Sequence, residues 1–516
     1  MESSSLNTLN CPLFLKLFNK KVNVYSLSIV LIIILAAFLR LFRISEHMEF
    51  LGDQGRDVLL VAKLLKEGDL LFIGPQTSVG NMYLGPWYYY MMAPFLLIFN
   101  YNPVGPSVMV VLISLLTTYL IYEFSKRWFN PIVGIISALL FALSPVVVKF
   151  SSFSWNPNVM PFFSLLVIWS VWKIYKGGSR KYFLLFGISF ALALNSHYLA
   201  LLLIPPAGLF LGLRFLGTKD KKQFIAKLLW SLAVFMLIMS PLVAFEIKHD
   251  FVLFNAFSKF TFQKEGSINF SGILNNLFIN WNLIFERLVL GKEKYLSTFL
   301  SLVFAFGIFL VGLKENKNIS IDFKRLLNKP FVYLTIWYLL GIIGLSSYKN
   351  EIYDHYFGFL FSLPFILVSY LLFKLFNQKT IGKILSILIL FFLLYLNIKN
   401  SNLWINPNNQ LQTTKQVDEL IINNSDNKSF NLALLAKQNY DMPYRYFFYI
   451  NDQPLFDLHE QITDQLFVIC ETWNTECNPL GHPLWEIAAF GWAKIDHQWN
   501  LNGIEIFKLV PNEEAD

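Results

Sequence analysis

Charged residues are scarce in this sequence. Only 15% of its 516 residues are charged, whereas 55% are hydrophobic and 17% are aromatic. This excess of apolar side chains is too large for the core of a water-soluble protein, and the mean hydropathy of +0.49 agrees. The composition therefore excludes soluble classes and predicts an integral membrane protein.

Cysteine is also rare, with only Cys11, Cys470 and Cys477. No Cys/His spacing is typical of a zinc site, and there is no Walker loop, dinucleotide fingerprint or transporter-like internal repeat. Cys470 and Cys477 lie seven residues apart in the polar tail and would form a disulfide only in an oxidising compartment, so both states stay open.

The net charge of +8 does not indicate a nucleic-acid partner. The basic residues form short clusters between apolar segments, as topology signals do, and not one basic face. Nucleic acid is therefore excluded as a partner.

The apolar segments predict a polytopic α-helical protein with about eleven transmembrane helices. The polar segment 1–21 precedes a first helix at about 22–42, and Arg40 and Arg43 follow in place of a signal-peptide cleavage site. With residues 1–21 in the cytoplasm, the later basic clusters also fall on the cytoplasmic side. Further helices are expected at about 104–124, 131–148, 157–175, 181–196, 198–216, 224–246, 296–313, 331–347, 356–374 and 381–398.

That topology makes 84–99 a re-entrant or interfacial helix, because a span there would invert every later basic cluster. A transmembrane domain at 22–398, with a first outer loop at 43–103, is followed by an extracytoplasmic domain at 399–516. Alternating runs at 430–435, 465–470 and 503–510 predict strands, and hence a small α/β fold. A long outer loop is expected at about 247–295.

The first outer loop holds the densest group of carboxylates, with Glu46, Glu49, Asp53 and Asp57 in a dozen residues. A charged run beside a membrane helix is often only a solvated loop. An inverting glycosyl transfer, however, needs a carboxylate that deprotonates the acceptor. Asp53 is the candidate base, since flanking glycines would let the backbone bend towards a substrate.

The other acids of this loop have ordinary alternatives. Glu46 and Glu49 are expected to be solvated or paired with Arg43 or Arg56. Asp57 stands at the start of a short amphipathic helix predicted at 57–66, where capping is an equal alternative to a catalytic role.

Several motifs resemble the GT-C membrane glycosyltransferases, in particular the protein mannosyltransferase (glycosyltransferase 39) and aminoarabinose transferase-like branch. They are FLGDQGRD at 50–57, GDL at 68–70, YLGPWYY at 83–89, LSP at 143–145, WNPN at 155–158 and YDHY at 353–356 running into Leu363 and Pro364. Each is short, but their order spans about residues 22–398.

The resemblance implies a polyprenyl-phosphate-linked sugar donor, inversion at the anomeric carbon and transfer on the extracytoplasmic face. It gives Asp53 the role of first-loop catalytic acid. The sequence departs from the family twice: Gln54 replaces the second acid of a common pair, and the loop at 149–158 lacks an acid found in some relatives. Asp57 is the candidate substitute.

The leaving phosphate and the sugar need polar groups on the same side of the membrane. The cationic or hydroxylic candidates are Lys149, His355, Tyr356, Arg56 and His197, and Asn156 and Asn158 are candidates for sugar hydroxyls. For a Lys or His beside a membrane helix, a snorkelling position at the interface is the alternative. Asn-Pro is also simply a good helix start.

The sequence thus predicts a membrane glycosyltransferase that uses a lipid, glycan or protein acceptor, with membrane lipids around it. No cofactor is required, and a divalent metal is compatible with the loop but not implied. The alternatives are a transporter or flippase for a lipid-linked sugar, and a binding or assembly factor. The near absence of ionisable residues within the predicted helices speaks against transport.

Overall fold

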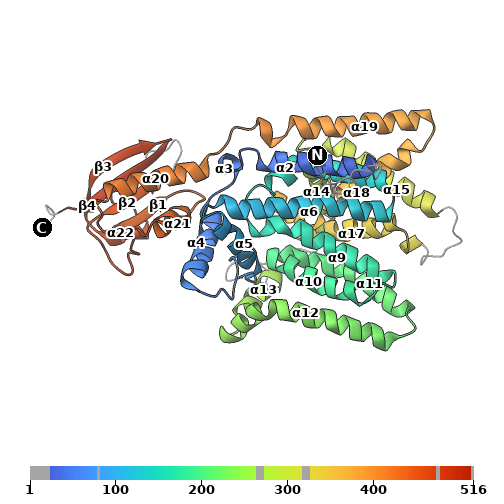
Figure 1. Ribbon diagram of the computed structural model, residues 1–516, viewed down its shortest axis with the longest axis horizontal. Coiled ribbons are helices and arrows are strands. Elements are labelled where there is room, and N and C mark those ends of the chain that lie inside the picture. Colours follow the sequence, from blue (N-terminus) through green and yellow to red (C-terminus); the bar gives the residue numbers. More distant parts are fainter. Residues whose placement is uncertain (1–23, 78–81, 263–271, 317–325, 472–476, 513–516) are drawn as a thin grey trace, which may run out of the picture.

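The computed structural model describes residues 24–77, 82–262, 272–316, 326–471 and 477–512. Figure 1 shows a long bundle of helices with a small α/β domain at one end. The helices α4 (Gly52–Glu67) and α5 (Trp87–Ile98) lie where the two parts meet. Cys11 and the N-terminal segment lie outside the described residues.

The polytopic α-helical fold is confirmed. In the described part of the chain, seven helices are long and apolar enough to cross a membrane, and an eighth is formed if η4 (Asp354–Leu360) and α18 (Ser362–Phe376), bent by 63°, count as one span. The seven are α2 (Val24–Leu41), α6 (Val104–Trp128), η1 with α9 (Asn156–Tyr175), η2 with α11 (Tyr198–Gly217), α12 (Lys221–Lys248), α15 (Ser297–Asn316) and α19 (Thr380–Lys399) with η5 (Asn402–Trp404).

A helix occupies each of the eleven predicted positions, but three of them are short. The helices α7 (Pro131–Leu143), α10 (Arg180–Ser196) and α17 (Pro330–Leu345) have 13, 17 and 16 residues. About 20 residues are needed to cross roughly 30 Å of hydrocarbon. By length, seven or eight of the described helices can therefore cross the membrane completely, whereas eleven spans were predicted from the apolar runs and basic clusters.

The bundle has a buried centre and a lipid-compatible rim. In the span formed by η1 and α9, 78% of the residues of the most apolar stretch are buried. In the corresponding stretches of α12 and α15 the share is 17% each. In α9 the ring of Trp169 stacks on Phe124 of α6 at 4.1 Å between centroids. Helices that are apolar on all sides are stable only when they face protein or lipid, which is the pattern here.

The segment from 84 to 99 contains no long helix. Its helix α5 has 12 residues, too few to cross a bilayer, and it packs beside α4 and α6 at the end of the bundle nearest the α/β domain. The long outer loop expected at about 247–295 is largely helical where it is described, and its residues 263–271 lie outside the described residues. Its apolar side chains support α13 (Val252–Phe262), α14 (Ile273–Ile284) and a π-helical turn, η3 (Phe285–Val289).

The C-terminal domain contains a four-stranded sheet in the order β1-β2-β4-β3. The strands β1 (Asn431–Leu435) and β2 (Leu466–Cys470) are parallel, and β4 (Ile504–Pro511) is antiparallel to β2. These three match the alternating runs of the sequence. The edge strand β3 (Ala493–Leu501) was not predicted, because its side chains are mostly exposed and polar. The helices α20 (Gln410–Asn424), α21 (Met442–Ile450) and α22 (Trp485–Phe490) complete the domain.

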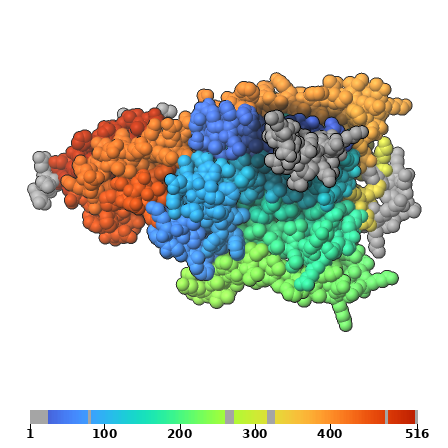
Figure 2. Space-filling view, viewed as in Figure 1, coloured from blue at the N-terminus to red at the C-terminus, as the bar shows by residue number. Residues whose placement is uncertain are grey.

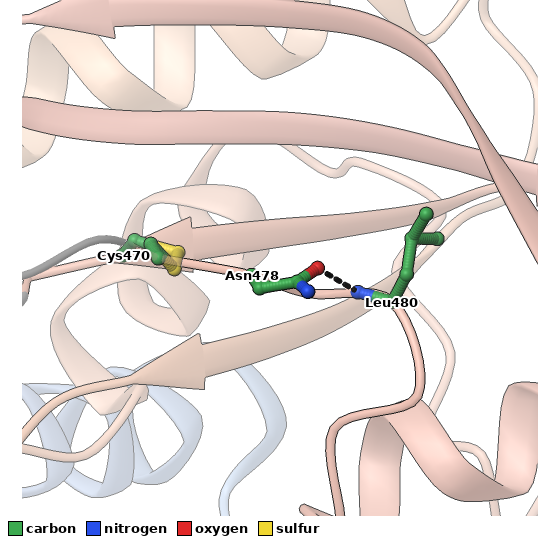
Figure 3. The surroundings of a disulfide bond; sticks show 4 residues. Cys470, Asn478 and Leu480 are labelled. Carbon is green, nitrogen blue, oxygen red and sulfur yellow. Dashed lines mark hydrogen bonds between the residues drawn. A yellow bond between two sulfur atoms is a disulfide. The ribbon is translucent and has the colours of Figure 1, made fainter.

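A disulfide joins Cys470, at the end of β2, to Cys477 (Figure 3). Of the two states left open by the sequence, the structure therefore contains the oxidised one. The next residue, Glu471, accepts hydrogen bonds from Asn439 and Tyr444.

Candidate active site

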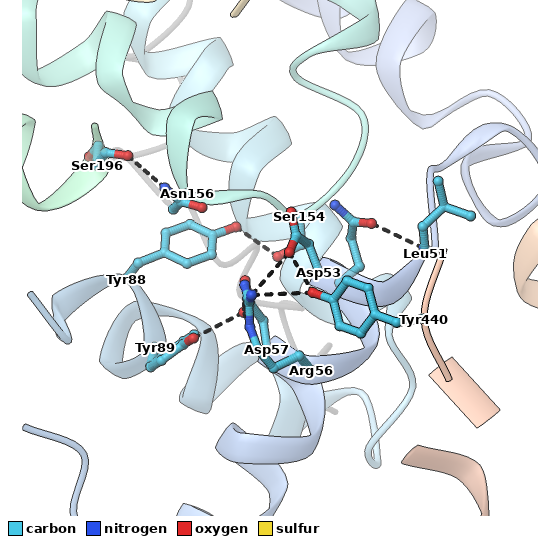
Figure 4. A network of polar contacts seen from close by, with 11 residues as sticks. Leu51, Asp53, Arg56, Asp57, Tyr88, Tyr89, Ser154, Asn156, Ser196 and Tyr440 are labelled. Atoms are coloured by element: carbon cyan, nitrogen blue, oxygen red, sulfur yellow. Dashed lines mark hydrogen bonds and ion pairs between the residues drawn. The ribbon is translucent and has the colours of Figure 1, made fainter. Parts of the chain in front are cut away.

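The candidate acids of the first loop lie on one face of α4, together with an arginine. Asp53, Arg56 and Asp57 occupy positions i, i+3 and i+4 of the helix, so their side chains are neighbours (Figure 4). Arg56 Nη1 donates to Asp53 Oδ1 over 3.0 Å, and Nε and Nη2 donate to Asp57 Oδ1 over 2.9 and 2.7 Å. The guanidinium therefore bridges the two carboxylates.

Asp57 is the buried member of this pair. Its side chain is 1% exposed, and the Tyr89 hydroxyl of α5 donates to Oδ1 over 3.0 Å. Burial raises the pKa of Asp57 to about 6, although the charge of Arg56 opposes the rise. Its Oδ2 has no hydrogen-bond partner among the described residues. Asp57 therefore positions Arg56 and does not contact a substrate, because its buried carboxylate cannot be reached from solvent.

Asp53 is the accessible member. Its side chain is 41% exposed, and both described contacts go to Oδ1. The second contact comes from the C-terminal domain, whose Tyr440 hydroxyl donates to Oδ1 over 2.5 Å. Arg56 Nη1 also donates to this hydroxyl over 3.2 Å. The carboxylate is therefore fixed from two sides through one oxygen.

The C-terminal domain also forms a hydrogen bond with the first residue of α4. The Gly52 amide donates to Asn439 Oδ1 over 2.8 Å, and Asn439 Nδ2 donates to Glu471 Oε2 over 2.8 Å. The Tyr444 hydroxyl donates to Glu471 Oε1 over 2.6 Å. The acid next to the disulfide thus anchors the residues that hold α4.

This arrangement corrects the expected role of the glycines. The helix α4 begins at Gly52, five residues before the predicted start at Asp57, so Asp53 lies in the first helical turn and not in a bent loop. A Cβ on Gly52 would lie 2.3 Å from the Tyr440 ring, and one on Gly55 would lie 2.3 Å from the Pro443 backbone nitrogen. The glycines therefore make room for the C-terminal domain.

The capping role considered for Asp57 is also wrong, since this residue lies inside α4 and not at its N-terminus. Glu46 pairs with Arg43, as expected. Glu49 pairs instead with Lys149, the last residue of α8 (Pro145–Lys149), and the distance from Nζ to Oε1 is 2.7 Å.

The candidates His197, His355 and Tyr356 form a second cluster. The His197 ring centroid lies 5.9 Å from that of His355 and 5.6 Å from that of Tyr356, and His355 lies 4.6 Å from Trp155. Burial lowers the pKa of His197 to about 4, so its ring is neutral near pH 7. Its Nδ1 accepts the Leu199 amide over 3.1 Å. His197 therefore offers a phosphate no positive charge.

The two asparagines of the second loop hold backbone groups. Asn156 Nδ2 donates to the Ser196 carbonyl over 2.7 Å, and Asn158 Nδ2 donates to the Phe153 carbonyl over 2.9 Å. Asn158 Oδ1 has no partner in the described part of the chain. Together with His355, Asn158 lines a small cavity of about 20 Å³. Asn156 and Asn158 thus have structural contacts that a sugar would have to replace or extend.

The sequence did not identify Tyr440 or Tyr89 as contacts of the acids. Tyr89 lies in the quoted YLGPWYY motif, whereas Tyr440 is 387 positions from Asp53 and no local pattern links them. Among the described residues, no group of three or more His, Cys, Asp or Glu side chains is arranged to hold a metal ion.

Residues 84–245 match the sequence profile of the family described as dolichyl-phosphate-mannose-protein mannosyltransferase. No curated protein sequence matches the chain at a significant level.

Solved structures are similar over most of the chain. ArnT from Cupriavidus metallidurans, bound to undecaprenyl phosphate, gives a TM-score of 0.59 at 12% identity, over 94% of this chain and 98% of that protein. Its apo state gives 0.57 at 11% identity over the same shares. The archaeal oligosaccharyltransferase AglB from Archaeoglobus fulgidus, in complex with an inhibitory peptide and a dolichol-phosphate, gives 0.53 at 11% identity. The match covers 84% of this chain and 64% of the length of AglB.

The protein is therefore a multi-pass membrane protein with the fold of the GT-C glycosyltransferases. The resemblance to the mannosyltransferase and aminoarabinose transferase-like branch of that superfamily, predicted from short motifs, is confirmed.

Proposed function

We propose that the protein is an inverting membrane glycosyltransferase. It moves a sugar from a polyprenyl-phosphate-linked donor to a lipid, glycan or protein acceptor, and Asp53 is the general base. The family match and the shared fold support the reaction class, because ArnT and AglB were each solved with a polyprenyl-type phosphate bound.

One observation carries the assignment of the base. Asp53 is the carboxylate of the α4 network that is both exposed and oriented, since Arg56 and Tyr440 hold Oδ1 while the side chain stays 41% exposed. A general base must be within hydrogen-bond reach of the proton that it takes. The buried Asp57 does not meet this condition.

The proposed reaction is a single displacement. The acceptor hydroxyl gives its proton to Asp53 as its oxygen bonds to the anomeric carbon. The bond from that carbon to the phosphate oxygen breaks, and the polyprenyl phosphate leaves with the electron pair. Lys149 is the proposed cation for the leaving phosphate, and His355 and Tyr356 line the same end of the bundle. Arg56 is proposed to orient Asp53 and not to bind phosphate, because its Nε, Nη1 and Nη2 each already donate to Asp53 or Asp57.

We place the site and the C-terminal domain on the extracytoplasmic side of the cell membrane. Two observations support this orientation. The loops predicted outside meet at one end of the bundle, as the pairs Lys149 with Glu49 and Arg287 with Asp354 illustrate. The disulfide of the domain is typical of an oxidising compartment.

Donor and acceptor are tested with the purified protein in lipid nanodiscs. It is given a panel of radiolabelled polyprenyl-phosphate sugars and an extract of envelope lipids and glycans. We expect one donor to lose its label to an acceptor, with one polyprenyl phosphate formed per sugar moved. The same protein is also reconstituted into vesicles, and if it moves labelled donor across their membrane chemically unchanged and without sugar transfer, it is a transporter and the proposal is wrong.

A further inference from the structure

Glu471 lies at the edge of the C-terminal sheet that meets the first loop. The parallel strands β1 and β2 end side by side, with Leu435 opposite Cys470, and the Glu471 amide donates to the Leu435 carbonyl over 2.9 Å. The carboxyl ends of neighbouring parallel strands share one edge of a sheet, so the segments that follow them lie close together. Asn439 follows β1 and Glu471 follows β2. This topology brings together two side chains that are 32 positions apart.

The Glu471 carboxylate fixes the side chain that contacts α4. Its Oε2 accepts from Asn439 and its Oε1 accepts from Tyr444, so each oxygen has a donor. Because Asn439 donates through its nitrogen, its oxygen is turned towards the Gly52 amide. The first amides of an α-helix have no acceptor within the helix. Asn439 thus supplies one, and Glu471 sets its orientation.

The residue after Asn439 contacts the proposed base. It is Tyr440, whose hydroxyl donates to Asp53 and whose ring packs against the backbone at Gly52. Asn439 and Tyr440 therefore hold Gly52 and Asp53, two successive residues of α4. Since one planar peptide unit joins Asn439 to Tyr440, a shift of the first moves the second. The orientation of Asp53 thus depends on the carboxylate of Glu471.

The disulfide restricts the backbone around Glu471. It joins Cys470 to Cys477, which are seven positions apart, and Glu471 lies between them in the chain. A cross-link that closes so short a ring removes many of the conformations open to the residues within it. The oxidised state therefore favours the one position from which the carboxylate reaches both of its donors.

Other contacts hold the C-terminal domain on the bundle without Glu471. The Tyr446 hydroxyl donates to the Tyr101 carbonyl, and the Tyr449 hydroxyl donates to Glu67, the last residue of α4. Figure 2 shows the orange and red C-terminal domain directly against the blue residues of the first loop. Loss of the Glu471 contacts should therefore loosen the start of α4 without releasing the domain.

We propose that Glu471 is a positioning residue for the Asp53 site and that the disulfide keeps it in place, so that sugar transfer depends on the oxidised state of Cys470 and Cys477. The inference rests on the proposed function, in which Asp53 is the base. A dithiol reverses the oxidised state by a balanced exchange. The S–S bond of the protein breaks, two cysteine thiols form, and the dithiol gives up two electrons and two protons to become a cyclic disulfide.

The kinetic test compares oxidised and dithiol-reduced protein, each with and without Glu471→Gln, in a Cys11→Ser background and with the donor identified in the panel. The Gln amide nitrogen would face one of the two donors, so one hydrogen bond is lost. We expect the substitution to lower kcat about fivefold with little change in KM. Reduction should lower kcat of the parent protein but not lower that of Glu471→Gln further, because both changes act through one carboxylate. Glu460→Gln, at an exposed acid of the same domain, should match the parent in both states.

A rescue variant separates positioning from loss of the fold. Asn439→Asp combined with Glu471→Gln reverses the hydrogen bond between the two side chains, since the new amide donates to the new carboxylate. The carboxylate can still accept from the Gly52 amide, and the carboxamide oxygen can still accept from Tyr444. We expect the double variant to recover most of the lost kcat, whereas a variant with a damaged domain would stay slow.

Hydrogen exchange supplies a readout that requires no sugar transfer. We expect the amides of 52–55 to exchange faster in Glu471→Gln and in the reduced protein, and those of 63–67, near the Tyr449 contact, to exchange as in the parent. This pattern in a protein that transfers no sugar would refute only the proposed function. An unchanged kcat after complete reduction, additive losses from reduction and substitution, or equal loss of protection along α4 would overturn the inference.

Discussion

The Tyr440 hydroxyl donates to Asp53 Oδ1 over 2.5 Å, although 387 positions separate the two residues. The bond links the C-terminal domain to the accessible acid of the first loop. Because Arg56 holds the same oxygen, the orientation of Asp53 depends on both parts of the protein. The C-terminal domain is thus a structural component of the proposed active site.

Removing this bond should slow the reaction more than it weakens binding. We expect Tyr440→Phe to lower kcat about tenfold with little change in KM, because a charge-assisted hydrogen bond of roughly 1.5–3 kcal/mol no longer orients the base. Tyr449→Phe is the control. Its hydroxyl, in α21, also joins the C-terminal domain to α4, but through Glu67 and away from Asp53. Equal kinetic losses in the two variants would mean that docking of the domain, and not orientation of Asp53, is what matters.

The close approach of α21 to α4 can be tested at a glycine. Gly55→Ala would place a methyl group 2.3 Å from the Pro443 backbone nitrogen, so one of the two helices must move. We expect a cost of about 1–3 kcal/mol in docking, seen as faster proteolysis of the linker after α19. Gly208→Ala in α11 has no atom within 4 Å of the added carbon and should cleave like wild type. An unchanged digestion pattern for Gly55→Ala would show that the contact is not needed.

Asp57 should make stability depend on pH. Its folded-state pKa of about 6 lies above the ordinary 3.8, so the folded protein binds the proton more tightly than the unfolded chain. The stabilisation is complete below the ordinary pKa and is lost as pH rises through about 6. Relative to Asp57→Asn, wild type should therefore lose about 2 kcal/mol of unfolding free energy between pH 4 and 7. Parallel pH curves for the two proteins would contradict the assignment.

Asp418 of α20 offers a second, independent titration within the C-terminal domain. It is 1% exposed, neither carboxyl oxygen has a hydrogen-bond partner among the described residues, and burial raises its pKa well above the usual value. The folded state thus binds the proton of Asp418 more tightly than the unfolded chain does, and this stabilisation is lost as pH rises. We expect Asp418→Asn to raise Tm more at pH 8 than at pH 5. A substitution that lowers Tm at both pH values would indicate an unseen partner for the carboxylate.

The helices and the acidic segment after the first helix could be predicted because they depend on local signals. Apolar runs and basic clusters located a helix at each expected span, and carboxylates beside a membrane helix marked the first loop. The start of α4 was missed because glycines weaken helix propensity. At Gly52 and Gly55 the reason for glycine is the approach of a domain distant in sequence.

The contacts of the site could not be predicted, because they join segments far apart in the chain. The partner of Glu49 proved to be Lys149, and Asn439 reaches Gly52 across 387 positions. Arg40 was interpreted only as a basic residue at the end of the first apolar run, whereas it is buried in the last turn of α2. His197 appears cationic in sequence, but the rings packed around it keep it neutral.

The most direct test of the account compares Asp53→Asn with wild type in single-turnover sugar transfer, at equal amounts of folded protein and with the donor identified in the panel. The carboxamide keeps the shape but cannot accept the proton, so the transfer rate should fall about a hundredfold or more while donor binding is retained. Glu46→Gln, which changes a partly exposed acid that pairs with Arg43 just before the same helix, should transfer at the wild-type rate. Transfer by Asp53→Asn at the wild-type rate would show that Asp53 is not the base and would contradict the central claim.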